Sequence, residues 1–272
     1  MTKAAMNGTE VILFPQFEEL KKEVQKLRTE LSMLVLERDE LKLVECRNIE
    51  MAYLISLGGL EYKAYEIDCS ILRLKRKIEL IQARKNRQEK IVLADIEKVL
   101  DKEFADYKEK LDEQIDKMNA ALERSRGTFL TEDETLELKK LYRTIVKALH
   151  PDLNPDLSDA QITLFHNAVY AYEHGDLNGI RVIAAMITDP EPPKVDIDSV
   201  KVLTKDKERL SKLLQDVKDS IAKIKSSYPY TLKPIVQDEK KTEARKTELE
   251  EIIKQLNEAL AVYKAKLAEM MR

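Results

Sequence analysis

The chain has 272 residues, of which 36% are charged and 6% aromatic, with no tryptophan and a formal net charge of −3. A chain of this composition can bury narrow apolar stripes rather than one thick core. The composition therefore predicts long helices and an elongated all-α architecture. With six glycines and eight prolines, the chain contains neither glycine-rich phosphate-binding motif, so the sequence gives no support to a dinucleotide-binding or P-loop enzyme.

The distribution of charge and hydropathy indicates whether the chain binds nucleic acid or a membrane. Charges of both signs are interspersed, so we expect no nucleic-acid partner. No apolar run approaches the roughly 20 residues that span a bilayer, and no export signal opens the chain, so we expect a soluble, cytoplasmic protein with no membrane partner. Cys46 and Cys69 are then expected to be reduced and to serve in packing.

The first part of the chain predicts an N-terminal tail over residues 1–14 and a helical coiled-coil hairpin over residues 15–126. Apolar residues recur in alternating steps of four and three at Leu20, Val24, Leu27, Leu31 and Leu34, and the pattern loosens after Arg38. It returns at Ile67, Ile71, Leu74, Ile78 and Ile81. Gly58 and Gly59 separate these stripes, so we predict a turn there between antiparallel helices. The polar run from Lys85 to Lys90 indicates a break or an exposed stretch, and the pattern leaves open whether residues 60–125 form one helix.

The last part of the chain repeats this design. Residues 189–195 contain a proline-rich run that predicts a short, stiff linker. Residues 196–272 are predicted to form a second antiparallel helical hairpin, because two apolar stripes flank a segment, Ser226 to Pro234, in which two prolines force a turn. The two stripes begin at Leu203 and at Leu249.

The segment between the hairpins has a different pattern. Thr131 with Glu134, and Ser158 with Gln161, have the spacing of capping boxes, so a helix should begin after each. Pro151 ends the first helix at Leu149, and a C′ role for Gly175 ends the second. The first helix gathers apolar side chains on one face and basic side chains on the opposite face, the latter being Lys139, Lys140, Arg143 and Lys147. We therefore expect two antiparallel helices with His150, Pro151 and Asp152 at the tip.

This segment, assigned to residues 130–188, resembles a J domain, the module with which DnaJ-type co-chaperones engage the DnaK-type, 70-kDa heat-shock ATPase. The matching residues are YRTIVKALHPDLNPD (Tyr142 to Asp156), with its HPD motif, and FHNAVYAYE (Phe165 to Glu173). Three features depart from the family: its short first helix is absent, Leu153 replaces the usual basic residue after the triplet, and the helix over 177–186 ends differently. The resemblance implies a divergent member braced by flanking coiled coils.

The resemblance also implies a function and a site. The His-Pro-Asp loop and the basic face would bind the ATPase and stimulate its ATP hydrolysis and closure on a client. Asp152 would accept hydrogen bonds from a basic group of the partner, and His150 and Pro151 would fix the direction of its carboxylate. Arg143 matches a basic family position, and the three lysines extend that face toward an acidic partner surface. The chain itself would be no enzyme and would need no cofactor or metal, and the client stays unidentified.

Other interpretations compete with this one. His150 could merely end a helix, Asp152 could form a turn, and the lysines could be a solvated face. An acid-base pair of His150 and Asp152 lacks a nucleophile, and His166 and His174 lack the further ligands of a zinc site. The alternative function is a structural coiled-coil adaptor whose degenerate J-like domain does not stimulate the ATPase. The apolar stripes are expected to be seams of the hairpins, with client recruitment or homo-oligomerisation as the alternative.

Overall fold

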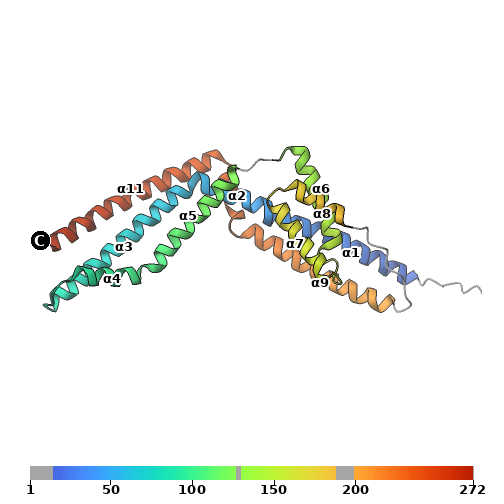
Figure 1. The fold of residues 1–272 in the computed structure, drawn as a ribbon, viewed down its shortest axis with the longest axis horizontal. Helices are drawn as coiled ribbons and strands as arrows, with labels where there is room; N and C mark the ends of the chain where they lie inside the picture. Colours follow the sequence, from blue (N-terminus) through green and yellow to red (C-terminus); the bar gives the residue numbers. More distant parts are fainter. Residues whose placement is uncertain (1–14, 127–129, 188–198, 272) are drawn as a thin grey trace, which may run out of the picture. The chain divides into compact units, whose positions relative to one another are not determined.

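The computed structural model describes residues 15–126, 130–187 and 199–271, and every regular element in these ranges is a helix, which confirms the all-α class (Figure 1). The predicted tail over 1–14 and linker over 189–195 lie outside the described residues. The chain divides into two compact units, which we call the first unit (residues 1–45 and 129–226) and the second unit (residues 46–128 and 227–272).

The described part of the first unit consists of a pair of long α-helices, three shorter α-helices and one π-helix. Its elements are α1 (Pro15–Asp39), the π-helix η1 (Glu40–Glu45), α6 (Glu132–Leu149), α7 (Asp159–Glu173), α8 (Leu177–Met186) and α9 (Ser199–Ser226). α1 and α9 pack side by side (Figure 1). Ion pairs link Glu23 to Lys207, Glu30 to Lys218 and Glu37 to Lys225, at 2.6, 2.9 and 2.7 Å. Because both numbers rise together, the two helices are parallel.

The second unit is built around another parallel pair. Its elements are α2 (Cys46–Tyr53), the π-helix η2 (Leu54–Gly58), α3 (Gly59–Asn86), α4 (Leu93–Glu103), α5 (Ala105–Arg126), the 3-10 helix η3 (Tyr230–Leu232), α10 (Lys233–Val236) and α11 (Glu239–Met270). Apolar clusters join Ile67 to Ile253 and Ile81 to Leu267, so α3 and α11 are parallel. Cys46 and Cys69 are buried thiols in this unit.

The predicted hairpin turn at Gly58 and Gly59 is wrong. Both glycines have helical backbone angles, with φ −56° and ψ −38° at Gly58 and φ −65° and ψ −34° at Gly59. Helix α5 packs beside these glycines, since a Cβ on Gly58 would make an ordinary contact 3.6 Å from Met118 Cγ. The chain reverses at residues 87–92, after which α4 and α5 run back along α3. Residues 60–125 are therefore not one helix.

The predicted C-terminal hairpin is also wrong. The segment after Ser226 does interrupt the helix, but α9 packs on α1 in the first unit and α11 packs on α3 in the second. A heptad stripe predicts that a helix packs against another helix. It does not identify that helix, and it does not show whether the two run parallel or antiparallel. The domains predicted over 15–126 and 196–272 are therefore each divided between the two units.

Replacing Gly59 with alanine tests the helical path. Because the backbone is helical and a Cβ would make an ordinary contact 4.0 Å from Met118 Cε, alanine should raise the free energy of unfolding by about 0.5–1 kcal/mol. Thermal unfolding followed by circular dichroism measures the change. Gly175→Ala is the control and should destabilise, because Gly175 has φ +68°. Destabilisation by Gly59→Ala would indicate a turn at Gly59.

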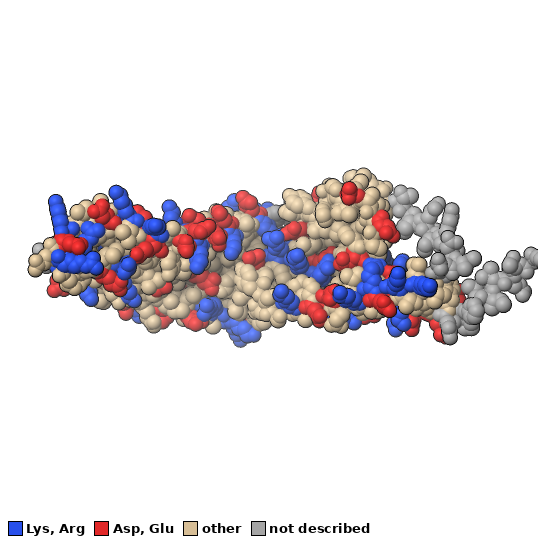
Figure 2. Space-filling model, turned by 90° about the horizontal axis from the view of Figure 1, so that it is seen from below, with Lys and Arg blue, Asp and Glu red and all other residues tan. Residues whose placement is uncertain are grey.

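The surface matches the mixed charge pattern of the sequence. Figure 2 shows lysine and arginine side chains interspersed with aspartate and glutamate on the face in view. Within the described ranges, every helix is too short or too polar to cross a membrane.

Candidate functional site

The site is the loop of residues 150–158 between α6 and α7, which we call the His-Pro-Asp loop. Both predicted capping boxes are confirmed. The Thr131 hydroxyl accepts from the Glu134 N–H at 3.3 Å while Glu134 accepts from the Thr131 N–H at 2.9 Å. Ser158 and Gln161 make the same exchange at the start of α7. The sequence therefore fixes where each helix flanking the loop begins.

Aromatic contacts hold α6 and α7 together beneath the loop. The Tyr142 and Tyr172 rings stack with centroids 4.0 Å apart, and His150 meets the Phe165 ring edge-on at 5.0 Å. The residue numbers run in opposite directions across these two contacts, so α6 and α7 are antiparallel, as predicted. Helix α8 packs on both and completes the apolar core. The loop is thereby placed at one end of a packed three-helix group.

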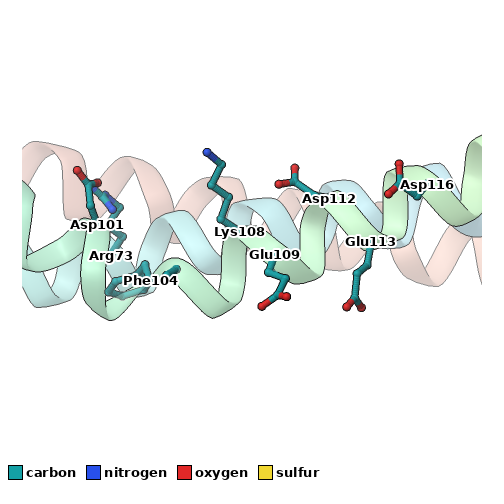
Figure 3. Close-up of a pocket in the computed structure, with 9 residues that line it drawn as sticks. Arg73, Asp101, Phe104, Lys108, Glu109, Asp112, Glu113 and Asp116 are labelled. Carbon is teal, nitrogen blue, oxygen red and sulfur yellow. The ribbon is translucent and has the colours of Figure 1, made fainter.

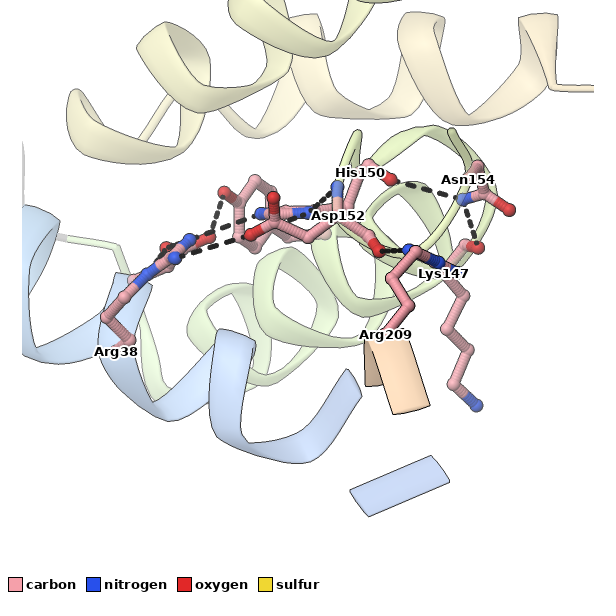
Figure 4. A network of polar contacts seen from close by, with 8 residues as sticks. Arg38, Lys147, His150, Asp152, Asn154 and Arg209 are labelled. Carbon is pink, nitrogen blue, oxygen red and sulfur yellow. Dashed lines mark hydrogen bonds and ion pairs between the residues drawn. The ribbon is translucent and has the colours of Figure 1, made fainter. Parts of the chain in front are cut away.

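Hydrogen bonds order the backbone of the loop (Figure 4). The His150 carbonyl accepts from the backbone N–H groups of Leu153 and Asn154, at 3.0 and 2.9 Å, and the Asn154 side chain caps the Lys147 carbonyl at 3.0 Å. The Asp152 N–H donates to His150 Nδ1 at 3.0 Å. Leu153 is buried, which explains why this position holds an apolar residue. Asn154 is a contributor that the sequence pattern did not reveal.

His150 is buried and its environment opposes protonation. Desolvation is the main cause that lowers its pKa, and the neighbouring Arg38 lowers it further, although the carboxylates of Asp152 and Asp39 act in the opposite direction. The ring nitrogens Nδ1 and Nε2 face the Asp152 N–H and the Arg38 guanidinium, at 3.0 and 3.2 Å. Both neighbours can only donate, so a neutral ring suits the site better than a charged one.

The pH dependence of His150 follows from this environment. We expect its imidazole to titrate below the ordinary value of about 6.5. The unfolded chain then binds more protons than the folded chain as the pH falls below about 6.5, so stability is lost on acidification, by at most about 1.4 kcal/mol per pH unit. Titration of the histidine ring resonances by NMR, assigned with His150→Gln, measures the pKa. A value above 6.5 would contradict the burial argument.

Asp152 is partly exposed and is contacted from both long helices of the first unit. Its side chain retains 37% exposure, and its Oδ2 lies 3.8 Å from Arg38 Nη1. Its backbone carbonyl accepts a hydrogen bond from Arg209 Nη1 at 2.8 Å. Figure 4 shows Arg38 reaching the loop from α1 and Arg209 reaching it from α9.

Arg38 and its neighbour Asp39 form a polar centre between α1 and α6. Arg38 Nε and Nη2 donate to Asp39 Oδ1 at 3.1 and 2.8 Å, and the Tyr142 hydroxyl donates to Asp39 Oδ2 at 2.9 Å. Burial, with the nearby Asp39 charge, raises the pKa of Tyr142 well above its usual value. The only sequence signal for this centre was the loosening of the apolar stripe after Arg38.

Arg209 is held in place by a second set of charges. Asp206 Oδ1 accepts from Arg209 Nη2 at 2.6 Å, and Asp206 Oδ2 accepts from Arg28 at 2.7 Å. Burial works to raise the pKa of Asp206, but these hydrogen bonds hold it below its usual value. No sequence pattern reveals this contact, because the apolar stripe of α9 predicts a separate hairpin.

The four basic residues predicted on α6 differ in their surroundings. Lys140, Arg143 and Lys147 are exposed, and no ion pair joins them to another residue in the described ranges. Lys139 forms an ion pair with Glu40 of η1. Three of the four basic side chains therefore remain accessible to a partner.

A hollow lies in the second unit between α3, α4 and α5 (Figure 3). It has a volume of about 710 Å³ and is lined by Arg73, Phe104, Lys108 and five acidic residues, Asp101, Glu109, Asp112, Glu113 and Asp116. Over residues 15–126, 130–187 and 199–271, no cluster of histidine, cysteine or acidic side chains is arranged to hold a metal ion. The His-Pro-Asp loop is therefore the better candidate site.

Comparison of the chain with protein-family models, with curated proteins and with solved structures gave no match.

Proposed function

We propose that the chain is a J-domain co-chaperone that binds a DnaK-type chaperone ATPase through the His-Pro-Asp loop and stimulates its ATP hydrolysis. The observation that carries the proposal is the placement of His150, Pro151 and Asp152 at the turn between two antiparallel helices with matched capping boxes. The chain would perform no catalysis itself, because hydrolysis belongs to the partner.

The chemistry of the loop supports a docking role. His150 binds the Asp152 N–H and is itself fixed against Phe165, so the carboxylate is presented from an ordered backbone. A partner's basic group would donate charge-assisted hydrogen bonds to this carboxylate, worth roughly 1.5–3 kcal/mol. The ordering is in place before binding, which reduces the entropy lost on association.

The exposed basic side chains of α6 support the same partner. Lys140, Arg143 and Lys147 project to solvent on the helix that leads into the loop. They would attract an acidic surface on the ATPase and accelerate encounter, an effect that salt weakens. The residues proposed to bind the partner are thus His150, Pro151, Asp152, Arg143, Lys140 and Lys147, with Lys139 engaged by Glu40.

The parallel helix pairs would supply targeting or assembly. The buried stripes of α1 and α9, and of α3 and α11, have the spacing of coiled-coil seams. We propose that these arms act in the cytoplasm, place the docking loop near a client protein, and offer surfaces for self-association. No cofactor is required for such a role.

One observation favours the alternative of a structural adaptor, since Arg38 already lies beside Asp152. Single-turnover ATP hydrolysis by a DnaK-type ATPase separates the two functions. A co-chaperone raises the rate of hydrolysis, whereas an adaptor with a degenerate J-like domain leaves it at the basal value.

A further inference from the structure

We propose that Arg38 is an intramolecular latch on the His-Pro-Asp loop, which occupies the Asp152 carboxylate and has to be displaced before a partner's basic group can bind there. This inference rests on the proposed function and adds a means of regulating it within the chain. Binding of the ATPase would exchange one cation for another at the same carboxylate.

The geometry of the guanidinium carries the proposal. Arginine presents its N–H donors in a planar fork, which lets one side chain contact two groups at once. The Nε and Nη2 atoms of Arg38 hold Asp39 at 3.1 and 2.8 Å, while Nη1 faces Asp152 Oδ2 at 3.8 Å. Arg38 is thus anchored by Asp39, and it reaches the loop through Nη1 at Asp152 and through Nη2, which also lies 3.2 Å from His150 Nε2. A cation held in this place competes with any cation supplied by a partner.

A second contact holds the same loop from the other long helix. Arg209 of α9 donates to the Asp152 carbonyl at 2.8 Å and is oriented by Asp206. The loop is therefore bound to α1 through a side chain and to α9 through the backbone. The backbone contact can persist after the latch opens, because it does not occupy the carboxylate.

The relative strengths of the contacts make the latch reversible. The Arg38–Asp152 pair is long, and the Asp152 side chain is 37% exposed, so solvent screens the attraction. The Arg38–Asp39 pair is shorter, and Asp39 is buried, so it remains when the partner binds. A partly screened ion pair of this kind reduces apparent affinity by about two- to five-fold rather than abolishing binding.

The test compares Arg38→Gln with the unaltered chain in single-turnover ATP hydrolysis, titrated against a DnaK-type ATPase. The variant should reach half-maximal stimulation at a concentration about two- to five-fold lower. Lys218→Gln is the charge-matched control, because it also removes one cation from the α1–α9 pair but contacts Glu30 rather than the loop. It should leave the half-maximal concentration unchanged or raise it slightly.

A second variant keeps the test valid if Arg38→Gln disturbs folding. Arg38→Gln with Asp39→Asn removes the buried carboxylate together with its cation, while the asparagine oxygen still accepts from Tyr142. This double variant should show the same gain. Thermal unfolding of each variant checks that the first unit is folded.

The outcomes separate the latch from the proposed function. Stimulation by the unaltered chain with no gain in either Arg38 variant overturns the latch and leaves the co-chaperone function intact. A loss of stimulation in those variants also overturns it, since Arg38 would then position Asp152. Stimulation by the unaltered chain that becomes half-maximal at an about two- to five-fold lower concentration in both Arg38 variants, and that is lost with His150→Gln, supports both. If no variant stimulates hydrolysis, the proposed function fails and the latch fails with it.

Discussion

Replacing Tyr142 with alanine is expected to destabilise the first unit by about 3–5 kcal/mol. Tyr142 is fully buried, its ring stacks on Tyr172, and its hydroxyl donates to the buried carboxylate of Asp39. Truncation leaves a cavity and removes a hydrogen bond from a charged group in the same step. The hydroxyl of this residue thereby links α6 to the end of α1.

Tyr142→Phe is the matched control, because it keeps the ring and removes only the hydroxyl. Tyr142→Phe should lower the free energy of unfolding by about 1–3 kcal/mol, because Asp39 keeps Arg38 as a partner but loses one hydrogen-bond donor. Native-state hydrogen exchange resolves both effects by comparing α6 and α7 amides with those of α3 and α11, which belong to the second unit. Equal loosening of both units, or a loss below about 1 kcal/mol in Tyr142→Ala, would contradict the assigned role.

The helices around the site could be predicted from sequence because their signals are local. Thr131 and Ser158 cap helices through residues three positions away, and Pro151 ends α6 through its own ring. The left-handed backbone at Gly175 likewise follows from its place after α7. Each of these signals acts within one helical turn, so the local structure that it predicts does not depend on the surrounding fold.

The pairing of the long helices could not be predicted, because it depends on residues far apart in the sequence. The stripes of α1 and α3 suggested that those two helices pair across Gly58 and Gly59, whereas each finds its partner more than a hundred positions further along. Glycine breaks a helix only weakly, by about 1 kcal/mol, and packing against Met118 readily offsets this cost.

The contacts that hold the His-Pro-Asp loop could not be predicted for the same reason. Arg38 and Arg209 looked like ordinary surface cations of helical hairpins, because their contacts with residues 150–152 appear only once α1 and α9 lie beside the loop. The loop itself could be identified from its own residues, but the side chains that hold it could not.

His150→Gln is expected to reduce stimulated ATP hydrolysis by about tenfold or more, to the basal rate of the partner. Glutamine lacks the rigid ring that packs against Phe165 and accepts from the Asp152 N–H, so the carboxylate loses its fixed direction. Loss of one well-oriented charge-assisted hydrogen bond is sufficient for an effect of this size. His166→Gln is the control, because His166 is exposed on α7, and it should stimulate like the unaltered chain.

The most direct test of the docking loop is therefore single-turnover ATP hydrolysis by a DnaK-type ATPase with the unaltered chain, His150→Gln and His166→Gln, each shown to be folded. We expect stimulation by the unaltered chain and by His166→Gln, and none by His150→Gln. Equal rates with all three proteins, whether stimulated or basal, would contradict a docking role for the His-Pro-Asp loop.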